Sequence, residues 1–292
     1  MPPRFPQEIF DEIIDQAVTI EMNLVESLRA HSLVSKGWLN RSRSIRFEEV
    51  LFHQPTDLER WCEKISPSPD GPGRYVKTLE ILSGVIPLVS DPQQLEKYID
   101  HFTSFTQVEN LILAHHKKEV HFDAIARCFS GFRNSVLFLE VNNSSFSFDE
   151  LSQIMELFPN LVTMMCQYAN LGRPSEDVQI NPPRQASFKS LSALYLVLTF
   201  EGRQKLEFDQ HLLSGFTKAS MENLELLGVR GKVPDLLPVQ ELVNSKANTL
   251  TTLRVQPLGR FRSKLCVYKL LILLLFLACR PRSFCMQQPS NY

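Results

Sequence analysis

The chain has 292 residues, of which 43% are hydrophobic and 22% charged, and its formal net charge is −1. These fractions are typical of a globular protein and exclude a wholly disordered chain, a collagen and a small disulfide-stapled domain. The near-balance of charge gives no sign of a nucleic-acid-binding protein. Six cysteines without a C-x-x-C pair, and a start without an apolar signal segment, favour a reduced protein of the cytoplasm or nucleus.

The charge is divided unevenly along the chain. Glu241 is the last acidic residue, and eight Lys and Arg residues follow it. Residues 1–241 therefore carry a net charge of −9, and the last 51 residues carry +8. This pattern separates an acidic body from a basic C-terminal end.

The first fifty residues are predicted to form three helices. Pro6 suits the first turn of a helix, and the apolar residues from Ile9 to Ala17 recur at helical spacing. Shorter apolar patterns around residues 24–28 and 33–39 predict two further helices. We expect residues 1–54 to fold as one helical domain.

The next segment, residues 55–74, is predicted to connect two domains. Its first part has the spacing of a helix, and its second part, residues 66–74, is rich in Pro, Ser and Gly. Such a run of helix and strand breakers favours a loop. We therefore expect a connecting helix followed by a linker.

Residues 75–259 contain a motif of three apolar residues, spaced apolar-x-x-apolar-x-apolar, that recurs seven times at intervals of 25–32 residues. The copies are Val76/Leu79/Ile81, Val108/Leu111/Leu113, Val136/Leu139/Val141, Leu161/Met164/Cys166, Leu191/Leu194/Leu196, Met221/Leu224/Leu226 and Leu250/Leu253/Val255. Apolar segments of helical spacing lie between copies, most clearly at residues 95–102, 122–129 and 151–158. Each unit is predicted as a strand and a helix, and units that cannot bury their apolar faces alone must stack into a curved α/β solenoid.

Strand residues that alternate with the buried ones are expected to face the concave side of such a solenoid, which these proteins use for binding. They form a mixed acidic and apolar set, which favours a protein partner over a phosphate backbone. The predicted substrate-binding residues are Glu80, Leu82, Glu140, Asn142, Met165, Gln167, Tyr195, Val197, Glu225 and Leu227.

No specific catalytic motif occurs in the sequence, so we expect no enzyme, no catalytic residue, no cofactor and no metal. The nearest approach to a metal site is the run His115 to His121. Its adjacent lysines would repel a cation, and a solvated loop is the favoured interpretation. Cys128 and Cys166 occupy apolar positions and are predicted to be buried, structural cysteines. The basic run from Lys36 to Arg46 is predicted to be a solvated helix face.

Residues 260–292 break the repeat. An uninterrupted apolar run, 270–279, is ten residues long and is flanked by basic residues. A membrane-spanning helix needs about 17–25 residues, so we do not expect a membrane anchor here. Three interpretations stay open: a folded part of the protein, a membrane tether, and a truncated or mis-spliced end that replaces further repeats.

The N-terminal region resembles an F-box. Residues 5–14 read Phe-Pro-Gln-Glu-Ile-Phe-Asp-Glu-Ile-Ile, similar to the family's opening Leu-Pro-x-Glu-Ile-x-x-x-Ile-Ile. Residues 31–38 read His-Ser-Leu-Val-Ser-Lys-Gly-Trp, similar to its Cys-Ser-Leu-Val-Ser-Lys-x-Trp stretch. The whole chain thus resembles an F-box protein of the type expanded in mushroom-forming fungi, with a three-helix F-box followed by a leucine-rich-repeat-like solenoid. Phe5 and His31 depart from the usual Leu and Cys.

This resemblance implies a substrate-recognition subunit of a Skp-cullin-F-box ubiquitin ligase. The F-box would dock on a Skp-family adaptor and through it a cullin, and the repeats would bind an unknown protein substrate. The adaptor-binding residues carried over by position are Phe5, Pro6, Ile9, Ile13, Leu28, Leu33, Val34 and Trp38, and some of these must build the F-box's own core. The alternative is a repeat-based interaction scaffold without a ligase link, whose N-terminal helices cap the solenoid and whose tail tethers it to a membrane.

Overall fold

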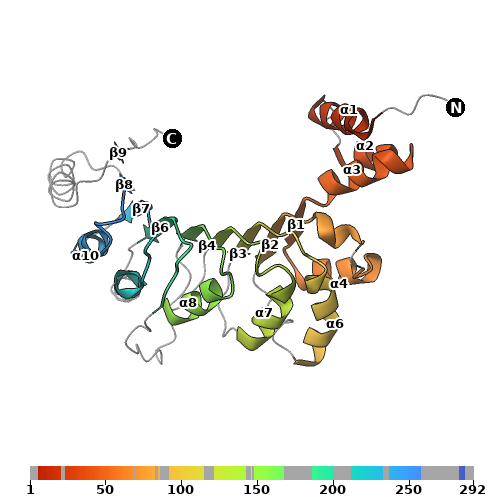
Figure 1. Ribbon diagram of the computed structural model, residues 1–292. Helices are drawn as coiled ribbons and strands as arrows, with labels where there is room; N and C mark the ends of the chain where they lie inside the picture. Colours follow the sequence, from red (N-terminus) through yellow and green to blue (C-terminus); the bar gives the residue numbers. More distant parts are fainter. Residues whose placement is uncertain are drawn as a thin grey trace.

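The computed structural model describes an α/β protein built on one parallel sheet (Figure 1). The described residues are 6–20, 24–68, 70–82, 85, 92–114, 122–142, 146, 148–167, 186–199, 212–232, 237–257 and 283–286. The sheet has nine strands in the order β1 to β9, so each strand pairs with the next one along the chain. Figure 1 shows that the strands follow an arc, with helices α4, α6, α7 and α8 on its outer side and helices α1 to α3 beyond its N-terminal end.

The three predicted N-terminal helices are confirmed. They are α1 (Gln7–Ile20), α2 (Leu24–His31) and α3 (Lys36–Arg46). The Ser35 side chain caps α3 by accepting a hydrogen bond from the Trp38 backbone N–H at 3.4 Å, which satisfies one of the free donors of the first turn. The helices pack around a small centre formed by Ile14 and Leu28.

The sheet begins earlier than the sequence predicts. β1 (Glu49–Phe52) pairs in parallel with β2 (Thr78–Leu82), so the first strand lies inside the predicted helical domain of residues 1–54. The connecting helix is α4 (Pro55–Lys64), and its Leu58 is fully buried. The predicted linker is also part of the packed body: Gly73, in the short 3₁₀ helix η1 (Pro72–Tyr75), is buried against Ser104. A four-residue strand carries too few alternating positions to be recognised in sequence.

The later units alternate strands with helices as predicted. The strands are β3 (Asn110–Ala114), β4 (Phe138–Asn142), β5 (Thr163–Gln167), β6 (Ala193–Thr199), β7 (Leu226–Lys232) and β8 (Thr252–Pro257). The helices between them are α6 (Pro92–Thr103), α7 (Phe122–Cys128) with the 3₁₀ turn η2 (Phe129–Gly131), α8 (Phe148–Glu156), residues 212–218 and α10 (Leu237–Ser245). The apolar triplets supply the inward strand positions: Leu79, Leu111 and Leu139 stand opposite one another in register and are fully buried.

One copy of the repeat is misaligned in the sequence-based prediction. The register pairs Leu194 of β6 with Leu227 of β7, and both side chains are fully buried. The buried triplet is therefore Leu224/Leu227/Val229, three residues later than the predicted Met221/Leu224/Leu226. Met221 and Leu224 are buried as well, in the turn that precedes the strand, so the apolar pattern alone fits both alignments.

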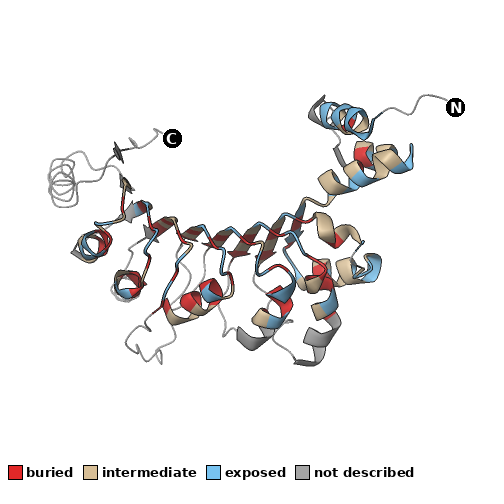
Figure 2. Cartoon of the chain, in the orientation of Figure 1, coloured by how far each residue is buried: buried red, intermediate tan, exposed pale blue. Residues whose placement is uncertain are grey.

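A single hydrophobic core fills the space between the sheet and its helices, and Figure 2 shows the buried residues gathered there. It extends without interruption from Val50 to Leu253. Aromatic rings of successive units contact one another through it; Phe129 lies against Phe102, Phe132 and Phe158, with ring centroids 5.1–6.2 Å apart. Cys128 and Cys166 are buried in this core, as predicted.

The C-terminal tail contributes one strand. Residues 283–286 form β9 (Ser283–Met286), which pairs in parallel with β8, so this part of the predicted atypical tail extends the sheet. The apolar run 270–279 lies outside the described residues, as does the His115 to His121 run. Within the described ranges, no helix is long and apolar enough to cross a bilayer.

Candidate protein-binding surfaces

Large hydrophobic side chains are exposed mainly at the N-terminal helices. Of the seven such side chains in the described residues, four lie within the first 34 positions: Ile9 (43% exposed), Ile13 (45%), Leu33 (83%) and Val34 (61%). Ile9 and Ile13 are one helical turn apart and share a face of α1. Leu33 and Val34 form the turn between α2 and α3. We call these four side chains the helical apolar surface.

A polar contact holds the start of α1 against the start of α3. The Gln7 side-chain amide donates to Asp11 Oδ1 at 2.8 Å and to the Gly37 backbone carbonyl at 2.9 Å. The second bond sets the first turn of α1 beside the first turn of α3. Since Val34 precedes Gly37 by only three residues, the exposed turn lies near the start of α1.

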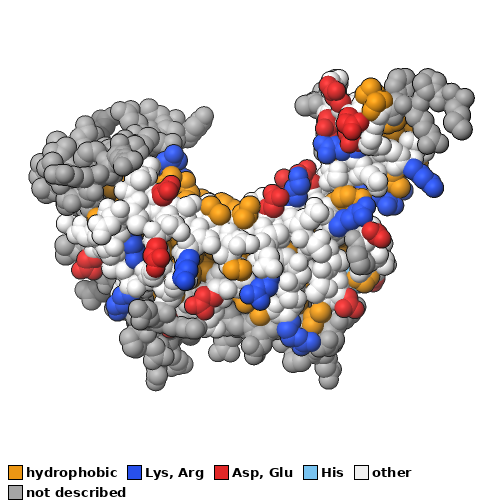
Figure 3. Space-filling view, viewed as in Figure 1, with side chains coloured by type: hydrophobic (Ala, Val, Ile, Leu, Met, Phe, Trp, Pro, Cys, Tyr) orange, Lys and Arg blue, Asp and Glu red, His pale blue; other side chains and the backbone are white. Residues whose placement is uncertain are grey.

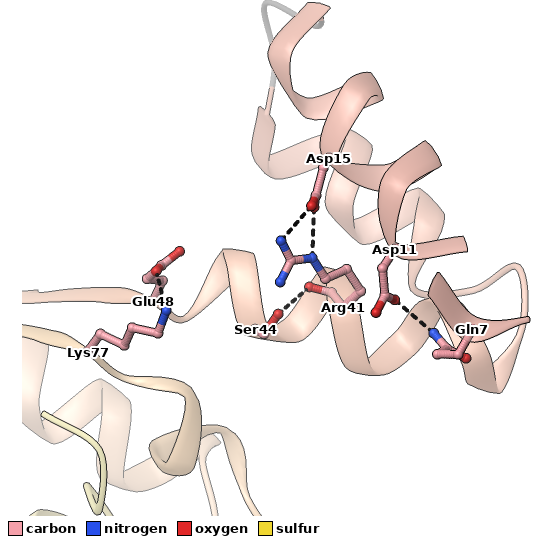
Figure 4. Close-up of polar contacts among 7 residues, drawn as sticks. All are labelled: Gln7, Asp11, Asp15, Arg41, Ser44, Glu48 and Lys77. Atoms are coloured by element: carbon pink, nitrogen blue, oxygen red, sulfur yellow. Dashed lines mark hydrogen bonds and ion pairs between the residues drawn. The ribbon is translucent and has the colours of Figure 1, made fainter. Parts of the chain in front are cut away.

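An ion pair fixes the other end of α1 (Figure 4). The Arg41 guanidinium donates through Nε and Nη2 to the two carboxylate oxygens of Asp15, both at 2.7 Å. This hydrogen bond is the main reason that the pKa of Arg41 is raised, so the arginine stays charged. Figure 4 also shows Lys77 paired with Glu48 at 3.0 Å, a contact between the residues that directly precede the neighbouring strands β2 and β1.

The structure divides the eight predicted adaptor-binding residues into separate groups. Pro6, Ile9, Ile13, Leu33 and Val34 are exposed, as a binding role requires. Leu28 is only 1% exposed, so its assignment to a binding surface is wrong: with Ile14 it forms the unit's own core. Phe5 lies outside the described residues.

Trp38 lies between the helices. Its ring meets the His31 ring edge-on, with centroids 5.3 Å apart, and the Phe10 ring lies 6.3 Å away. It is half-buried, so only part of the ring is open to a partner. Its main contacts are internal.

The second surface is the side of the sheet that faces away from the helices, which we call the open face. The register aligns its side chains in rows that cross the strands. One row contains Leu51, Glu80, Ile112, Glu140, Met165, Tyr195, Gly228 and Arg254. The next row contains Leu82, Ala114, Asn142, Gln167, Val197 and Arg230.

Eight of the ten predicted substrate-binding residues lie in these two rows. The group comprises Glu80, Leu82, Glu140, Asn142, Met165, Gln167, Tyr195 and Val197, with Val197 nearly covered. Glu225 is exposed but precedes β7. Leu227 points into the core, so its assignment is wrong, and the cause is the three-residue misalignment of this repeat.

Because of this misalignment, the predicted substrate-binding residues do not include Gly228 and Arg230 of the open face. They do not include Arg254 of this face either. The signal that could have found them is the pair Leu227 and Val229, which has the same two-residue spacing as every other inward pair. Gly228 has a particular role on the open face. A Cβ atom at this position would lie 2.5 Å from Tyr195 Cδ1, so the glycine leaves room for the tyrosine ring to lie across β7. Arg254 is the register partner of Gly228 on the next strand.

No protein-family model matches the chain, and no curated protein matches it. Among the described residues, no group of three His, Cys, Asp or Glu side chains is placed to hold a metal ion.

Proposed function

We propose that the protein is the substrate receptor of a Skp-cullin-F-box ubiquitin ligase. In this proposal α1 to α3 form an F-box that docks on a Skp-family adaptor, and the sheet with its outer helices is a leucine-rich-repeat-like solenoid that holds a protein substrate. The observation that carries the proposal is the helical apolar surface: four large apolar side chains are exposed on this unit, and among its described residues the buried hydrophobic side chains are Ile14 and Leu28.

Such exposure has an energetic cost that a partner can remove. Fully burying a Leu, Ile or Val side chain is worth about 1.5–3 kcal/mol. Leu33 and Val34 keep most of their surface in water, and Ile9 and Ile13 keep nearly half. Burial of all four against an apolar groove supplies several kcal/mol toward docking, as in helix-in-groove recognition. A unit that served only as a cap for the sheet would be expected to present a polar outer face.

The experiment is a binding assay between the full chain and a purified Skp-family adaptor. The intact chain is expected to bind, and Leu33→Asp/Val34→Asp is expected to abolish binding because it places two charges where apolar contact is needed. Both residues are exposed in a turn, so the variant should fold normally.

A matched control uses exposed apolar residues of the sheet. Leu137→Asp/Val162→Asp makes the same chemical change at side chains that are 43% and 38% exposed, far from the helical apolar surface. This variant should bind like the intact chain. Failure of the intact chain to bind, or equal loss in both variants, would overturn the proposal.

A second candidate function is a binding scaffold without a ligase link, in which α1 to α3 only cap the sheet. It is favoured by a contact that joins α3 to the 3₁₀ helix before β2: Tyr75 Oη donates to Asn40 Oδ1 at 3.4 Å. Deletion of residues 1–46 leaves β1 intact and separates the two roles. An insoluble truncated chain, together with no adaptor binding by the full chain, would favour the scaffold.

A further inference from the structure

Charge on the open face is sorted by strand. At the outward strand positions whose side chains the structure describes, the acidic residues are Glu49, Glu80 and Glu140, on β1, β2 and β4. The basic residues at such positions are Arg230 on β7 and Arg254 on β8. The described part of the open face is therefore acidic near the helical unit and basic near its other end.

No ion pair within the described ranges occupies these charges, although Glu140 Oε1 accepts a hydrogen bond of 2.6 Å from the Asn142 side-chain amide on the same face. The three ion pairs among the described residues join Arg41 to Asp15, Arg74 to Asp70 and Lys77 to Glu48, and none of them involves a charged residue of the open face. Arg230 and Arg254 are both exposed. Glu225 precedes β7 and lies five positions before Arg230, which is roughly 16 Å of extended strand.

An apolar floor lies between the two charged ends. It consists of Met165 on β5 with Tyr195 and Val197 on β6. Figure 3 shows hydrophobic side chains along the floor of the hollow, with acidic and basic side chains at both of its ends. Because Gly228 has no side chain, the Tyr195 ring continues this floor over Gly228 on β7.

Strand spacing sets the size of the segment that would fit. Neighbouring strands are about 4.8 Å apart, so Glu140 and Arg254, four strands apart in one row, are separated by about 19 Å. Glu80 lies about 29 Å from Arg254 by the same measure. An extended chain advances about 3.3 Å per residue, so about six to nine residues span these distances.

We propose that the open face binds a short extended segment of a partner protein in which acidic and basic residues are segregated. Asp or Glu residues of the segment pair with Arg230 and Arg254, apolar or aromatic residues lie on Met165, Tyr195 and Val197, and Lys or Arg residues face Glu80 and Glu140. This inference rests on the proposed function, since the segment would belong to the substrate. A second copy of the chain is a poor occupant, because two concave faces meet only at their rims.

The test is selection of a random peptide library, about 12 residues long to exceed the required span, on the immobilised full chain. Enriched peptides are expected to carry acidic residues at one end, basic residues at the other and apolar residues between them. Arg230→Glu/Arg254→Glu should weaken binding of a selected peptide by at least about tenfold, because two attractive pairs become repulsive. The control, Arg133→Glu/Lys218→Glu, makes the same charge change at exposed residues off the open face and should bind normally.

Three results would overturn the inference: no enrichment, enriched peptides with intermixed charges, or equal effects of the two double variants. A chain that sediments as a dimer, and becomes monomeric in the Arg230→Glu/Arg254→Glu variant, would also overturn it by identifying a second copy as the occupant. Adaptor binding is measured on the same variants. It should be unchanged in all of them, so failure here is distinguishable from failure of the proposed ligase function.

Discussion

The helical unit and the sheet differ most in how they use their apolar residues. The sheet and its helices bury theirs in one core that extends from Val50 to Leu253. The helical unit has a separate small core around Ile14 and Leu28, and exposes four large apolar side chains. The comparison teaches that the larger buried core, and with it most of the stabilising burial, lies in the sheet region, whereas the helical unit leaves large apolar side chains exposed.

Among the described residues, one side-chain hydrogen bond, from Tyr75 to Asn40, connects the helical unit to the sheet region. The Glu48–Lys77 ion pair lies beside the point where α3 leads into β1 and joins the starts of β1 and β2. Exposed polar pairs of this kind contribute about 0–1 kcal/mol to the free energy of unfolding. We therefore expect the helical unit to open locally at a lower free energy than the sheet.

The largest expected effect is loss of an aromatic ring from the sheet's core. Phe129→Ala removes a side chain that contacts three other rings and should lower the free energy of unfolding by about 3–5 kcal/mol. Urea unfolding followed by circular dichroism measures this change. Leu137→Ala, at an exposed position, should stay within about 0.5 kcal/mol of the parent chain.

A cavity in the helical unit should have a smaller and local effect. Ile14→Ala should lower the free energy of unfolding by about 2 kcal/mol. This is the low end of the range for truncating a buried Ile to Ala, because the half-exposed neighbours can close around the gap. Hydrogen exchange should accelerate in α1 to α3 and stay unchanged in β3 to β5. Equal acceleration in both regions would show that they unfold as one unit.

Two glycines should respond to alanine in opposite ways. A Cβ at Gly131 would lie 2.5–2.9 Å from backbone atoms of Thr103, so Gly131→Ala should destabilise the sheet region by about 1–3 kcal/mol. At Gly37 the nearest atom is the end of the flexible Gln7 side chain, at 3.0 Å. Gly37→Ala, inside a helix, should therefore be neutral or stabilising by up to about 1 kcal/mol. Thermal unfolding of the two variants tests the contrast.

At neutral pH, the Arg41–Asp15 ion pair of the helical unit should contribute less to the free energy of unfolding than the contacts considered above. Both Arg41 and Asp15 are more than one-third exposed, so Asp15→Asn should cost no more than about 1 kcal/mol. The loss should shrink in high salt, because exposed charges are screened. A loss that is independent of salt would contradict this account.

A pH effect on stability is expected from Lys246, in the turn after α10. Lys246 is buried, donates to the carbonyls of Thr217 and Ala219, and has a pKa lowered below its ordinary value of 10.5 by desolvation. Between the lowered pKa and 10.5, the unfolded chain binds more protons than the folded chain, so stability rises with pH. The folded chain should gain stability relative to Lys246→Met as the pH increases through this window, and denaturant titrations at several alkaline pH values measure it.

Local spacing in the sequence was sufficient to predict the helices and most of the strands. The 3.6-residue recurrence around Ile9 to Ala17 indicates α1, and six of the seven apolar triplets coincide with inward strand positions. The same spacing could not separate Leu28 from Leu33. Both are apolar residues of one short region, and only the packing of three helices decides which is enclosed and which is exposed.

Sequence alone determined the α/β class and the alternation of strand and helix, because both follow from the spacing of apolar residues along a single element. Tertiary structure decided what depends on contacts between elements. It placed β1 in the sheet through pairing with β2, and it set the register that buries Leu227 and exposes Arg230. An apolar pattern that fits two alignments is resolved only by the neighbouring strand, whose hydrogen bonds admit one of them.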